Sequence, residues 1–141
     1  AELIRRLAPV AACYLIGGRG EQRQLEEINA SSGSLAGVLA GTLTLGEVAA
    51  LIEKAKLLVT VDTGPMHIAN AVGTPVVALF GPTDPKGWGP RGASDIVLQH
   101  PVNCSPCWGK GLCEDHQCMK NLDTDTVISA AIGVMRGSSF G

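Results

Sequence analysis

Short apolar runs, each followed by a polar turn that contains glycine, constrain the fold of this chain more than any other feature. Runs of this length and composition are typical of strands that are covered on both faces, as in a parallel sheet. The runs are Val10–Ile16, Leu35–Ala40, Leu57–Val61 and Val76–Phe80, with Asp95–Gln99 as a last strand. We predict that Val10–Ile16, Leu57–Val61 and Val76–Phe80 are central strands.

Helical patterns alternate with these runs. Thr44 and Glu47 stand at the spacing of a capping box, so a helix is expected to begin there, with Leu45 on its apolar face. The other expected helices are an opening one that stops at Pro9, Glu21–Asn29, Gly64–Val72 closed by Gly73, and Thr124–Met135, while Lys86–Gly92 is expected to be a loop. Strands alternating with helices indicate an α/β, Rossmann-like parallel sheet with helices on both faces.

Composition fits one globular domain over residues 1–141. The chain is 45% hydrophobic and 17% charged, which excludes a disordered chain or a coiled coil. Its net charge is -2 and it contains no run of Lys or Arg, so nucleic acid is not an expected partner. No apolar stretch approaches the roughly 20 residues of a membrane span, and a cytoplasmic protein without a transmembrane segment is expected.

The junction after Leu57–Val61 is the most informative one for chemistry, because a buried strand passes there into a helix within three residues. Gly64 allows the backbone to approach a ligand closely, and Pro65 suits a first helical turn. The N–H groups and positive dipole end of such a helix form an anion site. The alternative is that Asp62 or Thr63 only caps the helix.

Further residues support a ligand site at this edge of the sheet. His67 lies in the first turn of the same helix, where it could donate to a phosphate oxygen or could be a half-buried structural histidine. The loops Gly17–Glu21 and Gly81–Pro85 also follow apolar runs. Because ligands of parallel α/β sheets bind beyond the carboxyl ends of the strands, these loops are expected to meet around a phosphate-bearing ligand.

Several motifs in order resemble those of a known family. The run VTVDTGPMHIANAVGTPVVALFGPTDP, Val59 to Pro85, resembles the signature of glycosyltransferase family 9, the ADP-heptose heptosyltransferases. GTLTLGEVAALIEKAKLLVT and GGRGE resemble the family's preceding helix and strand and an earlier loop. CSPCWGKGLCEDHQCMKNLDTDTV is similar to the cysteine-rich tail typical of the heptosyltransferase II type.

The resemblance implies which residues bind the donor. Asp62, Thr63, Gly64 and His67 would contact the diphosphate and sugar of the nucleotide-sugar. Glu21 would hold the ribose or adenosine end of the donor. Leu43 stands where the family commonly has Met against the adenine, so that contact would remain apolar.

The resemblance also implies an architecture and a reaction. This chain would be the C-terminal, donor-binding half of a GT-B glycosyltransferase, inactive alone, with the acceptor domain and the catalytic base in a missing N-terminal half. The reaction would be an inverting, metal-independent transfer of heptose from ADP-heptose to the inner core of lipopolysaccharide, with no cofactor required. The full-length protein would lie in the cytoplasm, peripheral to the inner membrane.

Four clustered cysteines suggest a different kind of chemistry. Cys104, Cys107, Cys113 and Cys118 follow a C-x2-C-x5-C-x4-C pattern, compact enough for a structural zinc site, with His116 as a competing ligand. Reduced thiols and adventitious disulfides are the alternatives. For the chain as a whole, the alternatives to an enzyme part are a non-catalytic nucleotide-binding module and a zinc-centred interaction module.

Overall fold

The computed structural model describes residues 1–110, 113 and 115–137. Contacts divide the chain into two compact units, Ala1–Ala50 and Leu51–Gly141, and each is described by itself. The expectation of one domain over residues 1–141 stays a prediction.

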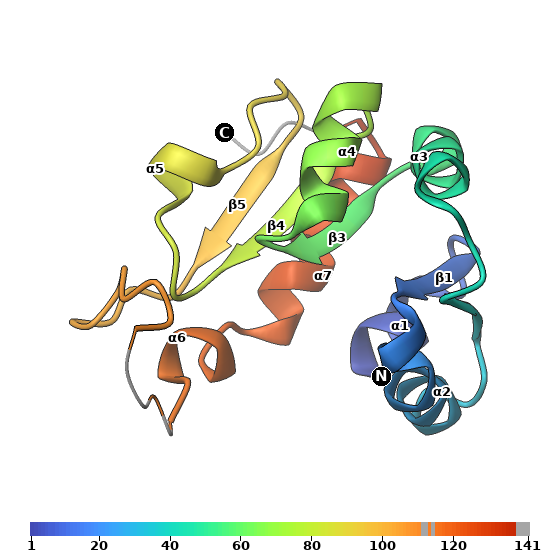
Figure 1. Ribbon diagram of the computed structural model, residues 1–141, viewed down its shortest axis with the longest axis horizontal. Helices are drawn as coiled ribbons and strands as arrows, with labels where there is room; N and C mark the ends of the chain where they lie inside the picture. The colour runs from blue at the N-terminus through green and yellow to red at the C-terminus, as the bar shows by residue number, and fades with distance from the viewer. Residues whose placement is uncertain (111–112, 114, 138–141) are drawn as a thin grey trace. The chain divides into compact units, whose positions relative to one another are not determined.

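The first unit contains a parallel pair of strands. Its elements are α1 (Glu2–Leu7), β1 (Cys13–Gly17), the short 3-10 helix η1 (Arg19–Glu21), α2 (Gln22–Ser31), β2 (Ala36–Ala40) and the start of α3 (Leu45–Lys54). The register of β1 and β2 runs from Cys13 opposite Ala36 to Gly17 opposite Ala40. α2 packs against both strands and connects the end of one to the start of the other, as a βαβ unit requires (Figure 1).

A single side chain fixes how α2 passes into β2. The Asn29 amide nitrogen donates to the carbonyl oxygen of Ala36, and its amide oxygen accepts from the N–H of Ala36, both at 2.9 Å. This pair of hydrogen bonds satisfies the backbone at the start of the strand. At the other end, the N–H of Gly41 donates to the carbonyl oxygen of Gly17 at 2.8 Å, which joins the carboxyl ends of β1 and β2.

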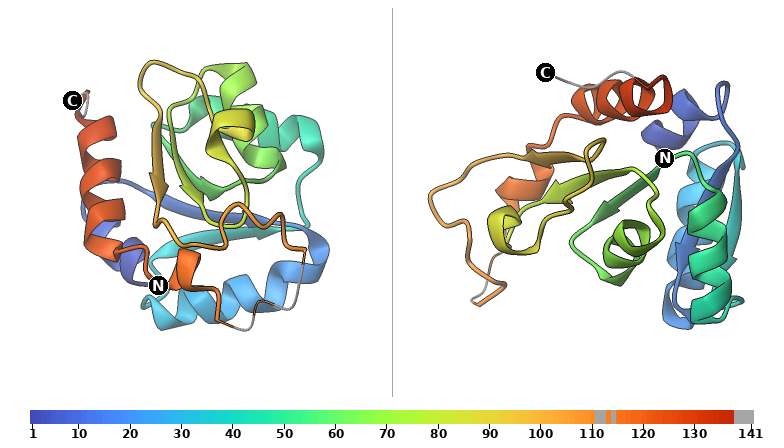
Figure 2. Two further views of the ribbon diagram at one scale, coloured as in Figure 1. Left: turned by 90° about the vertical axis from the view of Figure 1, so that its left-hand side faces the viewer. Right: turned by 90° about the horizontal axis from the view of Figure 1, so that it is seen from above.

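The second unit contains a three-stranded parallel sheet in the order β3-β4-β5. Its strands are β3 (Leu58–Val61), β4 (Val76–Phe80) and β5 (Ile96–Gln99), and its helices are α4 (Gly64–Val72), α5 (Pro85–Trp88), α6 (Gln117–Lys120) and α7 (Thr124–Met135). α4 and α7 lie on opposite faces of the sheet (Figures 1 and 2). This part of the chain therefore has the Rossmann-like three-layer arrangement.

The core of the second unit lies around β4. Four residues of this strand have no exposed surface, namely Val76, Val77, Ala78 and Phe80. α7 contacts β4, and its residues Ile128 and Ala131 are buried. The fully apolar sequence of β4 matches a strand that has neighbours on both edges and helices on both faces.

The side chains of Thr74 and Asp95 fix the backbone around the start of β4. The buried Thr74 hydroxyl donates to the carbonyl oxygen of Ile52 at 2.7 Å. The Asp95 carboxylate accepts from the N–H of Val76 at 2.9 Å and also from the N–H of Gly92, so the starts of β4 and β5 are held side by side. Gly73, in the left-handed region at φ 79, ends α4 just before this point, as predicted.

Several expectations from the sequence need correction. Only β4 has a strand on each side among the described residues; β1 and β3 each pair with one strand. β1 also begins at Cys13 rather than Val10, because the N–H groups of Val10 and Ala11 bond back to Leu7 in a turn that ends α1, and the Val10 side chain is 56% exposed.

The helical expectations hold with smaller changes. The bounds of α4 and α7 are those predicted, and the capping box is present: Glu47 accepts from the N–H of Thr44 at 2.8 Å, and Thr44 accepts from the N–H of Glu47 at 3.3 Å. Leu45 is 75% exposed and does not belong to the buried face of α3. A single helical turn, α5, stands at the start of the expected loop.

Candidate functional site

The turn between β3 and α4 brings four of the six predicted donor-binding residues together, namely Asp62, Thr63, Gly64 and His67. Thr63 is the N-cap of α4, with an extended backbone at φ -146 and ψ 170. β3 ends at Val61, so the turn lies at the carboxyl edge of the sheet, where ligands of parallel α/β folds bind.

No side chain caps the start of α4. The Thr63 hydroxyl makes no capping hydrogen bond and instead lies 3.3 Å from the carbonyl oxygen of Val61 and 3.2 Å from the Thr60 hydroxyl. N–H groups in the first turn of a helix have no partner within the helix and point away from its start. In α4, Pro65 has no N–H, and the N–H of Met66 donates to the carbonyl oxygen of Thr63 at 3.0 Å. What the first turn offers to an anion is therefore the N–H of Gly64, for which the described residues show no partner, and the positive end of the helix dipole.

The starts of α3 and α7 differ from that of α4. Glu47 and Thr44 cap α3, and hydrogen bonds from the Thr44 N–H and then from its hydroxyl lower the pKa of the Glu47 carboxyl. Asp123 caps α7 by accepting from the N–H of Thr126 at 2.9 Å. The alternative considered for the turn before α4 was capping by Asp62 or Thr63, and the described residues show no side-chain capping hydrogen bond there.

Open space surrounds Gly64. A Cβ atom built at this position meets nothing within 4 Å, and Gly64 has no positive φ that would require glycine. Neither packing nor backbone conformation therefore explains a glycine here. The missing side chain leaves the N–H of Gly64 open to approach.

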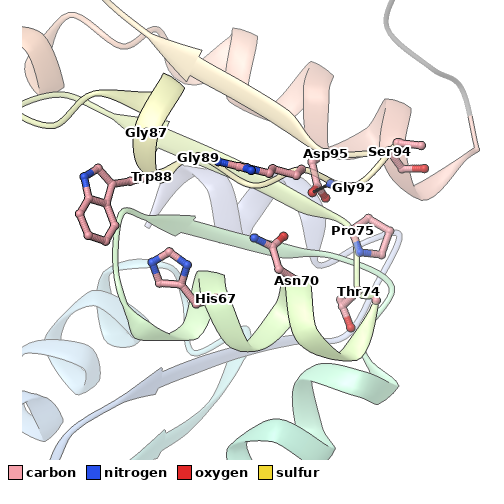
Figure 3. A pocket seen from close by; sticks show the side chains of 13 residues that line it. His67, Asn70, Thr74, Pro75, Gly87, Trp88, Gly89, Gly92, Ser94 and Asp95 are labelled. Atoms are coloured by element: carbon pink, nitrogen blue, oxygen red, sulfur yellow. Dashed lines mark hydrogen bonds between the residues drawn. The ribbon is translucent and has the colours of Figure 1, made fainter.

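His67 opens onto a pocket of about 570 Å³ in the second unit. His67 and Asn70 point into it from α4, and Trp88 reaches toward it from α5 (Figure 3). The His67 side chain is exposed, so the alternative of a half-buried structural histidine is not what this structure shows.

The pocket and the predicted donor turn overlap only in part. From His67 and Trp88 at the carboxyl edge, the pocket extends along α4 to Thr74 and Asp95 at the opposite edge of the sheet. Asp62, Thr63 and Gly64 are not among the residues that line it. His67 is therefore the one predicted donor-binding residue that lines this pocket.

Trp88 also lines this pocket, whereas from the sequence it was expected to pack a loop rather than to stack on a base. It is 53% exposed, whereas a tryptophan that only packs a loop would be covered. The one signal in the sequence was its place just after the Gly81–Pro85 loop, which follows β4 at the same edge of the sheet as the turn before α4. An indole exposed at this edge can stack on a ligand or cover it from water.

The loop after β4 contains one side-chain cap and one buried hydroxyl without a partner among the described residues. Asp84 caps α5 by accepting from the N–H of Lys86 at 2.9 Å. The Thr83 hydroxyl is buried and has no hydrogen-bond partner among the described residues. A buried hydroxyl without a partner is unusual, so the hydrogen bonding of this loop is incomplete among the described residues.

Glu21 and Leu43, the other two predicted donor-binding residues, belong to the first unit. Glu21 follows β1 in η1, and one of its carboxylate oxygens accepts from the N–H of Gly18 at 2.7 Å. Leu43 is half-buried in the connection between β2 and α3. The two loops pack together, because a Cβ atom on Gly41 would come within 2.5 Å of the Arg19 backbone. Glu21 and Leu43 therefore lie at the carboxyl edge of their own sheet.

The clustered cysteines surround a second pocket. Cys104 and Cys113 are exposed, Cys107 is half-buried and Cys118 is buried, and all four thiols are free. They line a cavity of about 350 Å³. Within residues 1–110, 113 and 115–137, no group of three or more His, Cys, Asp or Glu side chains is arranged to hold a metal ion. Cys13, in β1, is half-buried, and burial raises the pKa of its thiol.

Among the described residues, no helix combines the length and apolarity needed to cross a membrane. The longest helix, α7, spans 12 residues.

A parallel α/β fold with an uncapped helix start at the carboxyl edge of a strand is typical of nucleotide-binding Rossmann-like domains. The sequence profile of glycosyltransferase family 9 (heptosyltransferase) matches residues 1–117. The chain therefore belongs to glycosyltransferase family 9.

Relatives and solved structures agree with this assignment. The chain is 33% identical over 103 residues, 70% of its length and 30% of the relative's, to a lipopolysaccharide core heptosyltransferase of Haemophilus influenzae. It is 52% identical over 52 residues, 37% of its length and 15% of the relative's, to lipopolysaccharide heptosyltransferase 3 of Escherichia coli.

In three dimensions the chain is similar to the E. coli ADP-heptose lipopolysaccharide heptosyltransferase II, with a TM-score of 0.81 and 26% identity over 96% of this chain and 40% of that one. It is also similar to a family 9 glycosyltransferase of Veillonella parvula, with a TM-score of 0.76 and 27% identity over 96% of this chain and 42% of that one. The chain thus spans about two fifths of the solved structures that it matches.

Proposed function

We propose that this chain is the donor-binding part of a glycosyltransferase that moves heptose from ADP-heptose to the inner core of lipopolysaccharide. The observation that carries the proposal is the start of α4: its first turn has no side-chain cap, and Gly64 leaves the approach to it open. Family membership and the similarity to an enzyme named as an ADP-heptose heptosyltransferase support the choice of substrate.

The donor diphosphate binds at the first turn of α4 in this proposal. The N–H of Gly64 donates to a phosphate oxygen, and the exposed His67 side chain donates from the end of the same turn. Asp62 and Thr63 contact the diphosphate and the sugar. Trp88 faces His67 across the same end of the pocket and covers that end.

The nucleoside end of the donor binds through the first unit. One oxygen of the Glu21 carboxylate bonds to the N–H of Gly18, which orients the group and leaves the other oxygen for a ribose or adenosine hydrogen bond. Leu43 offers an apolar surface to the adenine.

The transfer itself requires no metal ion or cofactor in this proposal. An acceptor hydroxyl oxygen forms a bond to the anomeric carbon as the bond from that carbon to the phosphate oxygen breaks, which inverts the configuration. The acceptor proton passes to a general base, and ADP leaves with the bonding electrons. The N–H of Gly64, the positive end of the α4 dipole and His67 stabilise the charge that grows on the leaving phosphate.

We assign the general base and the lipopolysaccharide acceptor site to an N-terminal half of the full protein, and residues 1–141 to a single donor domain. In support, the chain matches about two fifths of the solved family members. In this proposal the full-length enzyme works in the cytoplasm, peripheral to the inner membrane, where it uses ADP-heptose and the core acceptor. Nucleic acid is not a partner in this account.

The test is a transfer assay with the full-length protein, ADP-heptose and a heptose-free core acceptor, with and without a strong chelator. We expect release of ADP and gain of one heptose by the acceptor, equally in both conditions, with inverted configuration by NMR. Binding of ADP-heptose without transfer would favour a non-catalytic nucleotide-binding module instead. Loss of transfer on chelation, restored by a divalent ion, would contradict the metal-independent mechanism.

A further inference from the structure

The pocket of about 570 Å³ continues beyond the end at which His67 and Trp88 face each other. Its further part is lined by Asn70 of α4 and by the loop that joins α5 to β5, which includes Arg91. The volume of the whole pocket lies within the range of small-molecule sites, roughly 300–1,000 Å³. The proposed donor site uses neither Asn70 nor Arg91, so this part of the pocket has no role in that account.

Arg91 brings a positive charge to the pocket that no other described residue neutralises. It is exposed, and it makes no hydrogen bond or ion pair with the described residues. Asp95 is the one carboxylate among the lining residues, and its two oxygens accept from the N–H groups of Val76 and Gly92. Because that carboxylate serves the backbone, the guanidinium of Arg91 remains available to an anion from outside.

The loop that carries Arg91 is fixed on both sides of it. Before Arg91, the N–H of Gly89 donates to the carbonyl oxygen of Pro85 at 2.8 Å. After it, the N–H of Asp95 donates to the carbonyl oxygen of Gly92 at 3.1 Å, and a Cβ atom on Gly92 would come within 2.7 Å of the Asp95 carboxylate. The backbone of Arg91 is therefore held in place without a ligand, which lowers the entropic cost of binding one.

Asn70 is the second polar group without a partner. It points into the pocket from α4 (Figure 3). Asparagine is unfavourable inside a helix, because its amide competes with the backbone for hydrogen bonds. The Asn29 amide holds the start of β2, whereas the exposed Asn70 side chain makes no hydrogen bond with the described residues. What Asn70 offers to the pocket is an amide that both donates and accepts.

Together these groups select one class of ligand. The planar guanidinium of Arg91 matches the paired oxygens of a phosphate or a carboxylate. Sugar hydroxyls both donate and accept, as the Asn70 amide does. Pro75 and Ala93, which also line the pocket, are small and apolar and can contact the C–H groups of a sugar ring. A free phosphate ion would use Arg91 and leave Asn70 without a partner.

We propose that the part of the pocket beyond His67 binds a sugar that carries a phosphate or a carboxylate. Arg91 holds the anionic group, and Asn70 holds hydroxyls of the ring. The proposal does not rest on donor binding at the start of α4, because Gly64 does not line this pocket.

Calorimetric titration of the full-length protein with three matched sugars tests the site. Glucose, glucose 6-phosphate and glucuronic acid share one ring and differ only at its sixth carbon. At least one of the two anionic sugars should bind at least about tenfold more tightly than glucose. Inorganic phosphate should bind more weakly than glucose 6-phosphate. Failure of both anionic sugars to exceed glucose would overturn the proposal, as would phosphate binding as tightly as glucose 6-phosphate.

Substitutions assign the binding to the pocket. Arg91→Gln should remove the advantage of the anionic sugars over glucose, and Arg91→Lys should restore part of it, because a lysine keeps the charge without the fork. Asn70→Ala should weaken binding of the anionic sugars and of glucose alike. Both side chains are exposed, so the melting temperatures should change little.

Arg136 provides the matched control, because it is an exposed arginine of the same unit that does not line the pocket. Arg136→Gln and Gly64→Ala should both bind the anionic sugars like the parent. Parent-like binding by a folded Arg91→Gln protein would overturn the proposal. Loss of binding in Gly64→Ala but not in Arg91→Gln would place the anionic group at the start of α4 instead.

Discussion

His67 on α4 and Trp88 on α5 line the same end of one pocket, although they belong to turns that follow different strands. The parallel pairing of β3 and β4 places those turns at a common edge of the sheet. The same edge carries the uncapped first turn of α4. A nucleotide-sugar bound there would meet the N–H of Gly64, an imidazole and an exposed indole.

Replacing His67 by Ala should weaken donor binding or turnover. A hydrogen bond to a charged phosphate contributes about 1.5–3 kcal/mol, so the loss should be roughly tenfold to a hundredfold in Kd or kcat/KM. Because the side chain is exposed, the melting temperature should change little. The matched variant His67→Gln keeps a donor and should recover part of the loss. Parent-like binding by a folded His67→Ala protein would exclude His67 from the site.

Replacing Asp62 by Asn separates sugar recognition from a structural role. The amide has the size of the carboxylate, and no side-chain cap of α4 is lost by the change, so stability should be preserved. Donor affinity should fall, because the amide accepts more weakly from a sugar hydroxyl. Comparing ADP-heptose with ADP measures this: the loss should be larger for the sugar-bearing ligand. An equal loss for both would place Asp62 at the diphosphate alone.

The cap of α7 should make stability depend on pH. Hydrogen bonds from the Thr126 hydroxyl and then from its N–H lower the pKa of Asp123 below the ordinary value of 3.8. A carboxyl whose pKa is lower in the folded state stabilises the fold above the unfolded-state pKa, and this stabilisation is lost as pH falls through the lowered value. Asp123→Ala should therefore lower the Tm by a few degrees at pH 7.

The control for this cap is Asp123→Asn, which retains a capping oxygen but does not titrate. Thermal melts across the acid range should show the Tm difference between the parent and Asp123→Ala shrinking as pH falls. A difference that persists unchanged below the folded-state pKa of Asp123 would show that the carboxylate charge is not involved.

The strands and the long helices could be predicted from the sequence because their signals are local. The apolar run of β4, the capping box at Thr44 and the closing Gly73 each follow from neighbouring residues. The start of β1 could not be placed, because Val10 is apolar yet lies in a turn whose N–H groups bond back to Leu7. Pairing partners of the strands depend on contacts between distant segments, which periodicity does not report.

Within the candidate site, only the residues that belong to one continuous motif could be predicted from the sequence. The turn from Asp62 to His67 is continuous in sequence, and the structure keeps it together. Trp88 enters the same pocket from another loop, and its exposure of 53% depends on how α5 is placed. The contacts of Ser105 and Trp108 with the Gly81–Pro85 loop likewise join segments that no local pattern connects.

Calorimetric titration of the parent and of Gly64→Ala with ADP-heptose and with ADP tests the central claim most directly. Beyond its own stretch of helix backbone, the added methyl group meets no protein atom within 4 Å, so the fold should be unaffected, but it should obstruct the approach of the diphosphate to the N–H of Gly64. Gly46→Ala is the matched control: it too lies in open space in a first helical turn, and Thr44 and Glu47 already cap its helix. The account predicts at least about tenfold weaker binding of both ligands by folded Gly64→Ala, about 1.4 kcal/mol, and parent-like binding by Gly46→Ala. Equal affinities for the parent and Gly64→Ala would show that the donor diphosphate does not bind at the start of α4.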